Sequence, residues 1–264
     1  MGDLPWCGAW GVRRVGAKVI ADAWHRELAG RLAELAGHPP VAPGPIEADS
    51  SYTSGGHGYY GVSVPERRRL VRAWLQQRRE TDASQMLATC DSLIASDVYE
   101  EKSLACMILG GHRAARSAVT PTMVFAWLDH LAGWAEVDSL CQNIFTAEQM
   151  LGDWPAWRDL IGRLAHDQNI NKRRAALVLL TGPVHYSPDT RLSALAFETI
   201  HALKHERAIL ITKAISWLLR SLIDNHAAAV AKYLEREQGR LPAIALRETR
   251  VKLLTGTKRG RAPV

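Results

Sequence analysis

The chain has 264 residues, of which 47% are hydrophobic, and a formal net charge of +6. This length suits one large domain or two small ones, and the apolar share is sufficient to bury a substantial core. The basic excess favours a polyanionic partner. No apolar run reaches the roughly 20 residues that a membrane-spanning helix needs, so we expect no contact with a membrane.

The N-terminal part alternates between irregular and helical patterns. Residues 1–15 are expected to form a flexible arm, because the first dozen contain three glycines and no helical period. The stretch 17–36, AKVIADAWHRELAGRLAELA, predicts an amphipathic helix that ends at Gly37. Residues 38–61 are rich in Pro, Gly and Ser, which is typical of a loop. Pro65 suits the first turn of the next helix, with Ser63 as its cap.

From residue 64 onward, apolar residues recur at helical spacing and Gly, Pro or Asp-Asn breaks separate the segments. The expected helices are 65–79, 83–96, 99–113, 120–133, 134–150, 155–167, 169–184, 191–205, 208–225, 227–240 and 244–256. Short helices joined by short turns pack as antiparallel pairs. We therefore predict an all-α fold, a HEAT-like helical-repeat solenoid over a single domain 16–255, with a basic C-terminal tail 256–264. A helical bundle is the structural alternative.

Basic residues accompany several of the apolar stripes. On a curved solenoid such residues could line one concave surface and follow a DNA phosphate backbone. Any one of these cations, considered alone, also fits a solvated helix face. The expected DNA-contacting residues of this kind are Lys172, Arg173, Arg174, Lys213, Arg220 and Arg247.

Two tryptophans stand at helical spacing from charged residues. Trp134 and Asp138 are four residues apart, and Trp217 and Arg220 are three apart, so each pair shares a helix face. A carboxylate beside an indole is unusual on a buried apolar face, whereas a cationic ligand is attracted to both groups. A place in the core is the alternative for either tryptophan.

Four blocks of the sequence together resemble a known family. They are YYGVSVPERRRLVRAW, GWAEVDSLCQNIF, NINKRRAALVLL and ITKAISWLLR…LPAIALRETRVKLL, in this order and at these spacings. The chain resembles the AlkD-like DNA alkylation-repair glycosylases, a HEAT-like-repeat family, over about residues 45–255.

The resemblance implies roles for individual residues. Asp138 in WAEVD matches the catalytic aspartate of the family, and Trp134 and Trp217 match its two cleft tryptophans. Arg174 in KRRAA matches the arginine that contacts the DNA backbone beside the lesion. Tyr52 in SSYTSGG matches an N-terminal cleft tyrosine.

The chain departs from the family pattern at two positions. Gly133 stands where a second tryptophan commonly precedes Trp134, and Asn171 stands where an aromatic residue is often found. These changes bear on the shape of the cleft and on lesion preference, and they leave the residues needed for the chemistry in place.

The resemblance implies a monofunctional DNA glycosylase that hydrolyses the N-glycosidic bond of positively charged N3- or N7-alkylpurines in duplex DNA and starts base excision repair without base flipping. Two alternatives remain: a non-catalytic relative that binds damaged or branched DNA, and a HEAT-like scaffold that binds proteins. We expect no cofactor and no metal, because HExxH, Walker and dinucleotide motifs are missing. We further expect a monomeric cytoplasmic protein at the nucleoid, with reduced cysteines, whose partner is double-stranded DNA that contains alkylated bases.

Overall fold

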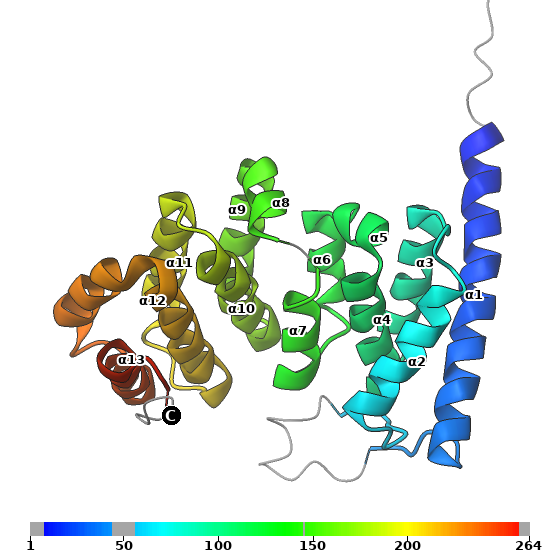
Figure 1. Ribbon diagram of the computed structural model, residues 1–264, viewed down its shortest axis with the longest axis horizontal. Coiled ribbons are helices and arrows are strands. Elements are labelled where there is room, and N and C mark those ends of the chain that lie inside the picture. Colours follow the sequence, from blue (N-terminus) through cyan, green and yellow to red (C-terminus); the bar gives the residue numbers. More distant parts are fainter. Residues whose placement is uncertain (1–7, 44–55, 145, 259–264) are drawn as a thin grey trace, which may run out of the picture. The chain divides into compact units, whose positions relative to one another are not determined.

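The computed structural model describes residues 8–43, 56–144 and 146–258, with side chains from residue 18 onward. These ranges hold thirteen helices and only two isolated β-bridges, Val41 with Tyr59 and Gly58 with Val98 (Figure 1). The all-α prediction is therefore confirmed for the described residues. None of the described helices is both long and apolar enough to cross a membrane. Tyr52 lies outside the described residues.

The chain divides into two compact units, 1–120 and 121–264. The first unit contains α1 (Gly8–Ala36), α2 (Val64–Gln76), α3 (Ala83–Ile94), α4 (Tyr99–Gly111) and the short α5 (Arg113–Ser117). Helix α3 packs against α1, α4 and α5, and α2 packs against α4. The core of this first unit includes Leu28, Leu32, Trp74, Met86 and Leu104.

Two local predictions for this unit can be compared with the structure. Helix α1 begins at Gly8, so residues 8–15 of the expected arm are helical. Glycines inside a helix cost about 1 kcal/mol each relative to alanine, which weakens a helical pattern without forbidding the helix. Ser63 is the N-cap of α2, as predicted, and its backbone N–H donates to the Glu66 carboxylate at 3.1 Å in a capping box.

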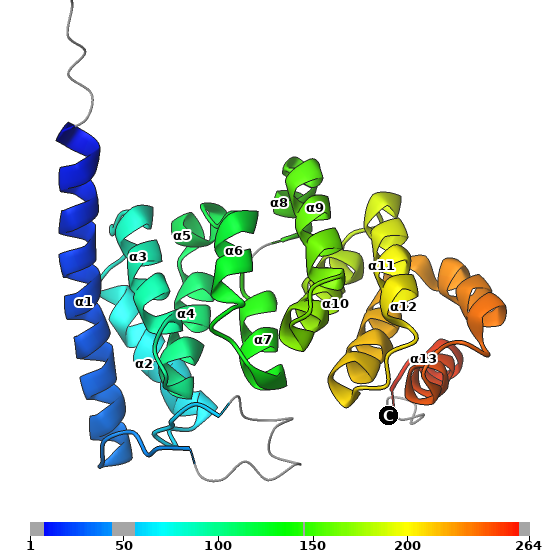
Figure 2. The same ribbon diagram turned by 180° about the vertical axis from the view of Figure 1, so that it is seen from behind.

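The second unit is built around one buried helix. It contains α6 (Pro121–Trp127), α7 (Gly133–Cys141), α8 (Ala147–Gly152), α9 (Trp154–Ala165), α10 (Ile170–Tyr186), α11 (Thr190–Leu203), α12 (Ile209–Glu237) and α13 (Ala243–Thr255). Helix α10 packs against α7, α8, α9, α11 and α12, and α13 packs against α12 (Figure 2). The run from Ala175 to Leu180 is fully buried. A helical segment that is apolar on all sides belongs in a core, and the middle of α10 therefore gives its neighbours a fixed support.

Two predicted helices in this unit differ clearly from the structure. The expected helix 120–133 ends at Trp127 as α6, and Gly133 begins α7. The expected helix 134–150 is divided into α7 and α8, because Asn143 donates to the Ser139 carbonyl at the end of α7 and Thr146 caps α8. By contrast, the expected helices 208–225 and 227–240 are confirmed as two helical segments, both within α12, that meet at a kink at His226, whose backbone angles (φ −134°, ψ 31°) are not helical. This break lies directly after the Asp-Asn pair at which the two helices were predicted to separate.

Candidate active site

An arginine on α10 holds the candidate catalytic aspartate on α7. Arg174 Nε donates to Asp138 Oδ1 and its second terminal nitrogen donates to Asp138 Oδ2, each at 2.8 Å. The other terminal nitrogen donates to the Leu210 carbonyl on α12 at 2.5 Å. The Arg174 side chain is 4% exposed and that of Asp138 is 14% exposed. One buried guanidinium thus joins three helices and fixes the carboxylate with fork geometry.

Two opposing influences set the protonation of this aspartate. Burial raises the pKa of the Asp138 carboxyl above its ordinary value of 3.8, and the hydrogen bonds and charge of Arg174 oppose that rise. A bidentate pair at 2.8 Å favours the ionised form strongly, so we take the carboxylate as ionised at neutral pH.

The aspartate lies on a helix face that also carries an aromatic and an amide side chain. Trp134 precedes Asp138 by four residues and Gln142 follows it by four, the latter at the C-cap of α7. Trp134 is half-buried, whereas Trp127 and Trp157 are buried in the core. Gln142 Nε2 donates to Thr181 Oγ1 on α10 at 2.8 Å. Helix α7 is therefore hydrogen-bonded to α10 through both Asp138 and Gln142.

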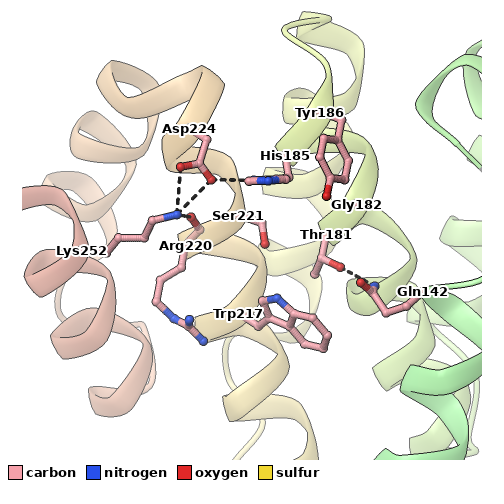
Figure 3. Close-up of a pocket in the computed structure, with 10 residues that line it drawn as sticks. All are labelled: Gln142, Thr181, Gly182, His185, Tyr186, Trp217, Arg220, Ser221, Asp224 and Lys252. Carbon is pink, nitrogen blue, oxygen red and sulfur yellow. Dashed lines mark hydrogen bonds and ion pairs between the residues drawn. The ribbon is translucent and has the colours of Figure 1, made fainter. Parts of the chain in front are cut away.

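A polar recess adjoins the other candidate tryptophan. It measures about 260 Å³, and its lining includes Gln142, Thr181, Trp217, Arg220 and Tyr186 (Figure 3). Trp217 is half-buried and lies two helical turns after Leu210 on α12. Because Gln142 and Trp217 line the recess, the recess extends the surface of the candidate site along α10 and α12.

An ion-pair network forms the far wall of the recess. Asp224 accepts hydrogen bonds from Lys252 at 2.9 Å and 3.1 Å and lies 2.7 Å from His185 Nδ1 (Figure 3). Burial acts to raise the pKa of Asp224, but the Lys252 and His185 contacts outweigh it and leave that pKa below its ordinary value. The sequence pattern did not bring these three residues together, because they lie on three different helices.

Most of the cations predicted to contact DNA already have partners inside the protein. Lys172 is buried and lies 2.6 Å from Asp129, and Arg173 pairs with Glu206 at 2.6 Å. Arg220 lies 3.5 Å from Glu248. Each would have to share or give up a carboxylate in order to contact a phosphate.

The remaining predicted cations differ in exposure. Lys213 is half-buried, and Arg247 is exposed on α13. The contacts of Lys172, Arg173, Arg174, Lys213, Arg220 and Arg247 with DNA stay predictions, and among them Arg247 is the side chain most accessible to a phosphate. Among the residues that the structure describes, no group of three or more His, Cys, Asp or Glu side chains could hold a metal ion.

The fold and this geometry define an all-helical protein, over the described residues, with an arginine-held carboxylate and half-buried indoles on two helices that both pack against α10. A family model described as DNA alkylation repair enzyme matches residues 42–253. The chain belongs to this DNA alkylation repair enzyme family.

A solved structure supports the same fold. It is a predicted DNA alkylation repair enzyme from Enterococcus faecalis, similar with a TM-score of 0.60 and 16% sequence identity over 84% of this chain and 93% of that chain. At this identity the likeness concerns the fold, and it agrees with the predicted helical-repeat architecture. No curated protein matches the chain with significance.

Proposed function

We propose that this protein is a monofunctional DNA glycosylase that hydrolyses the N-glycosidic bond of positively charged N3- or N7-alkylpurines in duplex DNA and so starts base excision repair. The observation that carries the proposal is the Asp138 carboxylate, held at 2.8 Å by Arg174 and 14% exposed, on the same helix face as Trp134. Family membership supports repair of alkylated DNA, and the site supports this particular reaction.

The chemistry of the lesion explains why these groups suffice. An alkyl group on N3 or N7 gives the purine a positive charge, so the C1′–N9 bond breaks with its electron pair moving to the base, which leaves neutral. The deoxyribose gains oxocarbenium character, as in other glycoside cleavages. Water then adds to C1′ and loses a proton, and an abasic site remains. The reaction needs stabilisation of positive charge and a placed water, and needs little acid catalysis.

Asp138 can supply both requirements. A carboxylate has about four acceptor positions on its two oxygens, and Arg174 occupies one on each oxygen. The remaining lone pairs can face the sugar or orient the water. Because the carboxylate is fixed before the reaction, it stabilises the developing cation without having to reorganise. The indole faces of Trp134 and Trp217 would add cation–π attraction of about 0.5–2 kcal/mol each.

The open character of the site favours excision without base flipping. Trp134, Asp138 and Trp217 are all half-buried on helix surfaces, and the adjoining recess is polar. We therefore propose that a monomer of this protein holds the lesion against this surface in the cytoplasm, at the nucleoid. No cofactor or metal enters the proposed reaction.

The direct test is base release from duplexes that carry one N3- or N7-alkylpurine, with spontaneous release subtracted. Release of the free base, with an abasic site and no strand cleavage, supports the proposal. Tight binding without release would favour the non-catalytic DNA-binding alternative, in which the Asp138–Arg174 pair would serve only structure. An undamaged duplex of the same sequence is the matched control.

A further inference from the structure

The helix that carries Trp134 and Asp138 has no capping side chain at its N-cap position, although its own Glu136 carboxylate accepts the Ala132 N–H at 2.9 Å. Its N-cap position is Ala132, which offers no side-chain acceptor. The first N–H groups of a helix lack partners inside that helix and need an acceptor from elsewhere. In α7 the acceptor for Gly133 comes from 38 residues away, because Gly133 N–H donates to Asn171 Oδ1 on α10 at 3.0 Å.

Asn171 lies on the same helix as Arg174, one turn earlier. Helix α10 therefore holds α7 at two points within the helix, with Asn171 on the Gly133 N–H and Arg174 on Asp138, in addition to the Thr181 contact with Gln142 at the C-cap. At a rise of about 1.5 Å per residue, these two points are roughly 7.5 Å apart along α7, with Trp134 between them. Asp138 lies in the second half of α7 and Gln142 at its C-cap, so the Asn171 contact is the one of these three that holds the first turn, where Trp134 lies.

The backbone at Gly133 makes this contact specific. Gly133 is buried and has φ 73°, the left-handed region that glycine enters without strain. This conformation aims its N–H at Asn171 while the chain turns from Ala132 into α7. The start of the helix, and hence the position of the adjacent Trp134, depends on both residues.

The partner in this contact is itself held. Asn169, the N-cap of α10, accepts a hydrogen bond from the Asn171 backbone N–H at 2.9 Å. The Asn171 side chain thus extends from the capped first turn of a helix whose residues 174–181 are buried. A fixed base of this kind suits a residue that orients another element.

We propose that Asn171 is a positioning residue for the candidate active site: it caps α7 from α10 and fixes the first turn of this helix, so that Trp134 keeps its place beside the Asp138 carboxylate held by Arg174. It acts through Gly133 and is not itself catalytic. Its effect on rate rests on the proposed glycosylase function. Misplacement of a reacting group by about 1 Å can cost up to about 100-fold in rate.

The test compares four forms of the full chain: wild type, Asn171→Leu, Asn171→Asp and Asp189→Ala. Leucine keeps the approximate size of asparagine and lacks the acceptor, whereas aspartate keeps the acceptor. Asp189 caps α11 through the Arg191 N–H at 2.9 Å, so Asp189→Ala controls for the loss of a helix cap elsewhere in the same unit. The measurements are single-turnover base release from an N7-alkylpurine duplex, duplex affinity, and amide exchange of the segment 132–138.

We expect Asn171→Leu to slow base release about 10- to 100-fold with little change in affinity, and to speed amide exchange at 132–138. Asn171→Asp should retain most of the rate and the protection, and Asp189→Ala should resemble wild type at the site. Equal rates for Asn171→Leu and Asp189→Ala would overturn the proposal, as would an Asn171→Asp variant as slow as Asn171→Leu.

The exchange measurement separates this inference from the proposed function. If the wild type released no base, the glycosylase proposal would fail, and amide exchange alone would decide the role of Asn171. Faster exchange in Asn171→Leu, restored in Asn171→Asp, would keep the capping role. Unchanged exchange in Asn171→Leu would overturn it.

Discussion

Arg174 donates hydrogen bonds to both carboxylate oxygens of Asp138 at 2.8 Å, and its remaining terminal nitrogen donates to the Leu210 carbonyl at 2.5 Å. The pair is 36 residues apart in sequence and links α7, α10 and α12 at the candidate site. In the proposed enzyme, the guanidinium therefore orients the carboxylate and keeps it ionised against the effect of burial.

Replacing this arginine should move the pH profile of base release. Burial already raises the pKa of Asp138, so loss of the Arg174 cation should raise this pKa further. On acidification, the carboxylate of the variant should therefore become protonated at a higher pH than that of the wild type. The rate should decline as pH drops through this pKa, and that acid limb should lie at higher pH in Arg174→Met than in wild type. Arg174→Lys keeps a charge without the fork and should fall between the two.

The check on this prediction is a single-turnover pH–rate profile for the three forms, with thermal melts to confirm folding. Superimposable acid limbs would show that Arg174 does not control the ionisation of Asp138.

The two candidate cleft tryptophans should each contribute less than the aspartate. An indole face near a cation is worth about 0.5–2 kcal/mol, which corresponds to roughly 2- to 30-fold in rate. Trp134→Ala and Trp217→Ala should slow release by this range, and the phenylalanine variants should lose less. Trp154→Ala, on α9, is the matched control because Trp154 is also half-buried and lies outside the site. An equal loss in Trp154→Ala would assign the effect to general destabilisation.

DNA affinity should depend on exposed cations more than on paired ones. Arg247 is exposed, whereas Arg173 is held by Glu206 at 2.6 Å. If Arg247 neutralises one phosphate, Arg247→Ala should flatten the plot of log affinity against log salt by about 0.9 units for every duplex sequence. Arg173→Ala should alter thermal stability more than this slope. The opposite ranking of the two slopes would contradict the contact assigned to Arg247.

The sequence alone could predict the helices and the faces on which the candidate residues lie. The spacing of Trp134 and Asp138 and the all-α class both follow from helical periodicity. The end of α6 at Trp127 and the broken helix at Asn143 were not predictable, because capping contacts and tertiary packing decide where a short helix ends.

Ion pairs between residues far apart in the chain also could not be predicted from the sequence. A local pattern shows three consecutive cations at residues 172–174, but it gives no sign of their acid partners Asp129, Glu206 and Asp138. The same limit applies to Gly133 and Asn171. As single positions they are two departures from a family pattern, and only the fold reveals that they bond to each other.

The central claim is that Asp138 supplies the negative charge that base release requires. Asp138→Asn keeps the size of the side chain and removes its charge, so single-turnover release from an N3- or N7-alkylpurine duplex should fall by roughly 10²–10³, or about 2–4 kcal/mol. Asp159→Asn, an exposed carboxylate on α9 whose side chain is 70% exposed, is the matched control and should keep the wild-type rate. Melting curves and duplex affinities measured beside the rates should show that Asp138→Asn is folded and binds DNA about as well as wild type. Release by a folded Asp138→Asn variant at the wild-type rate would contradict the account.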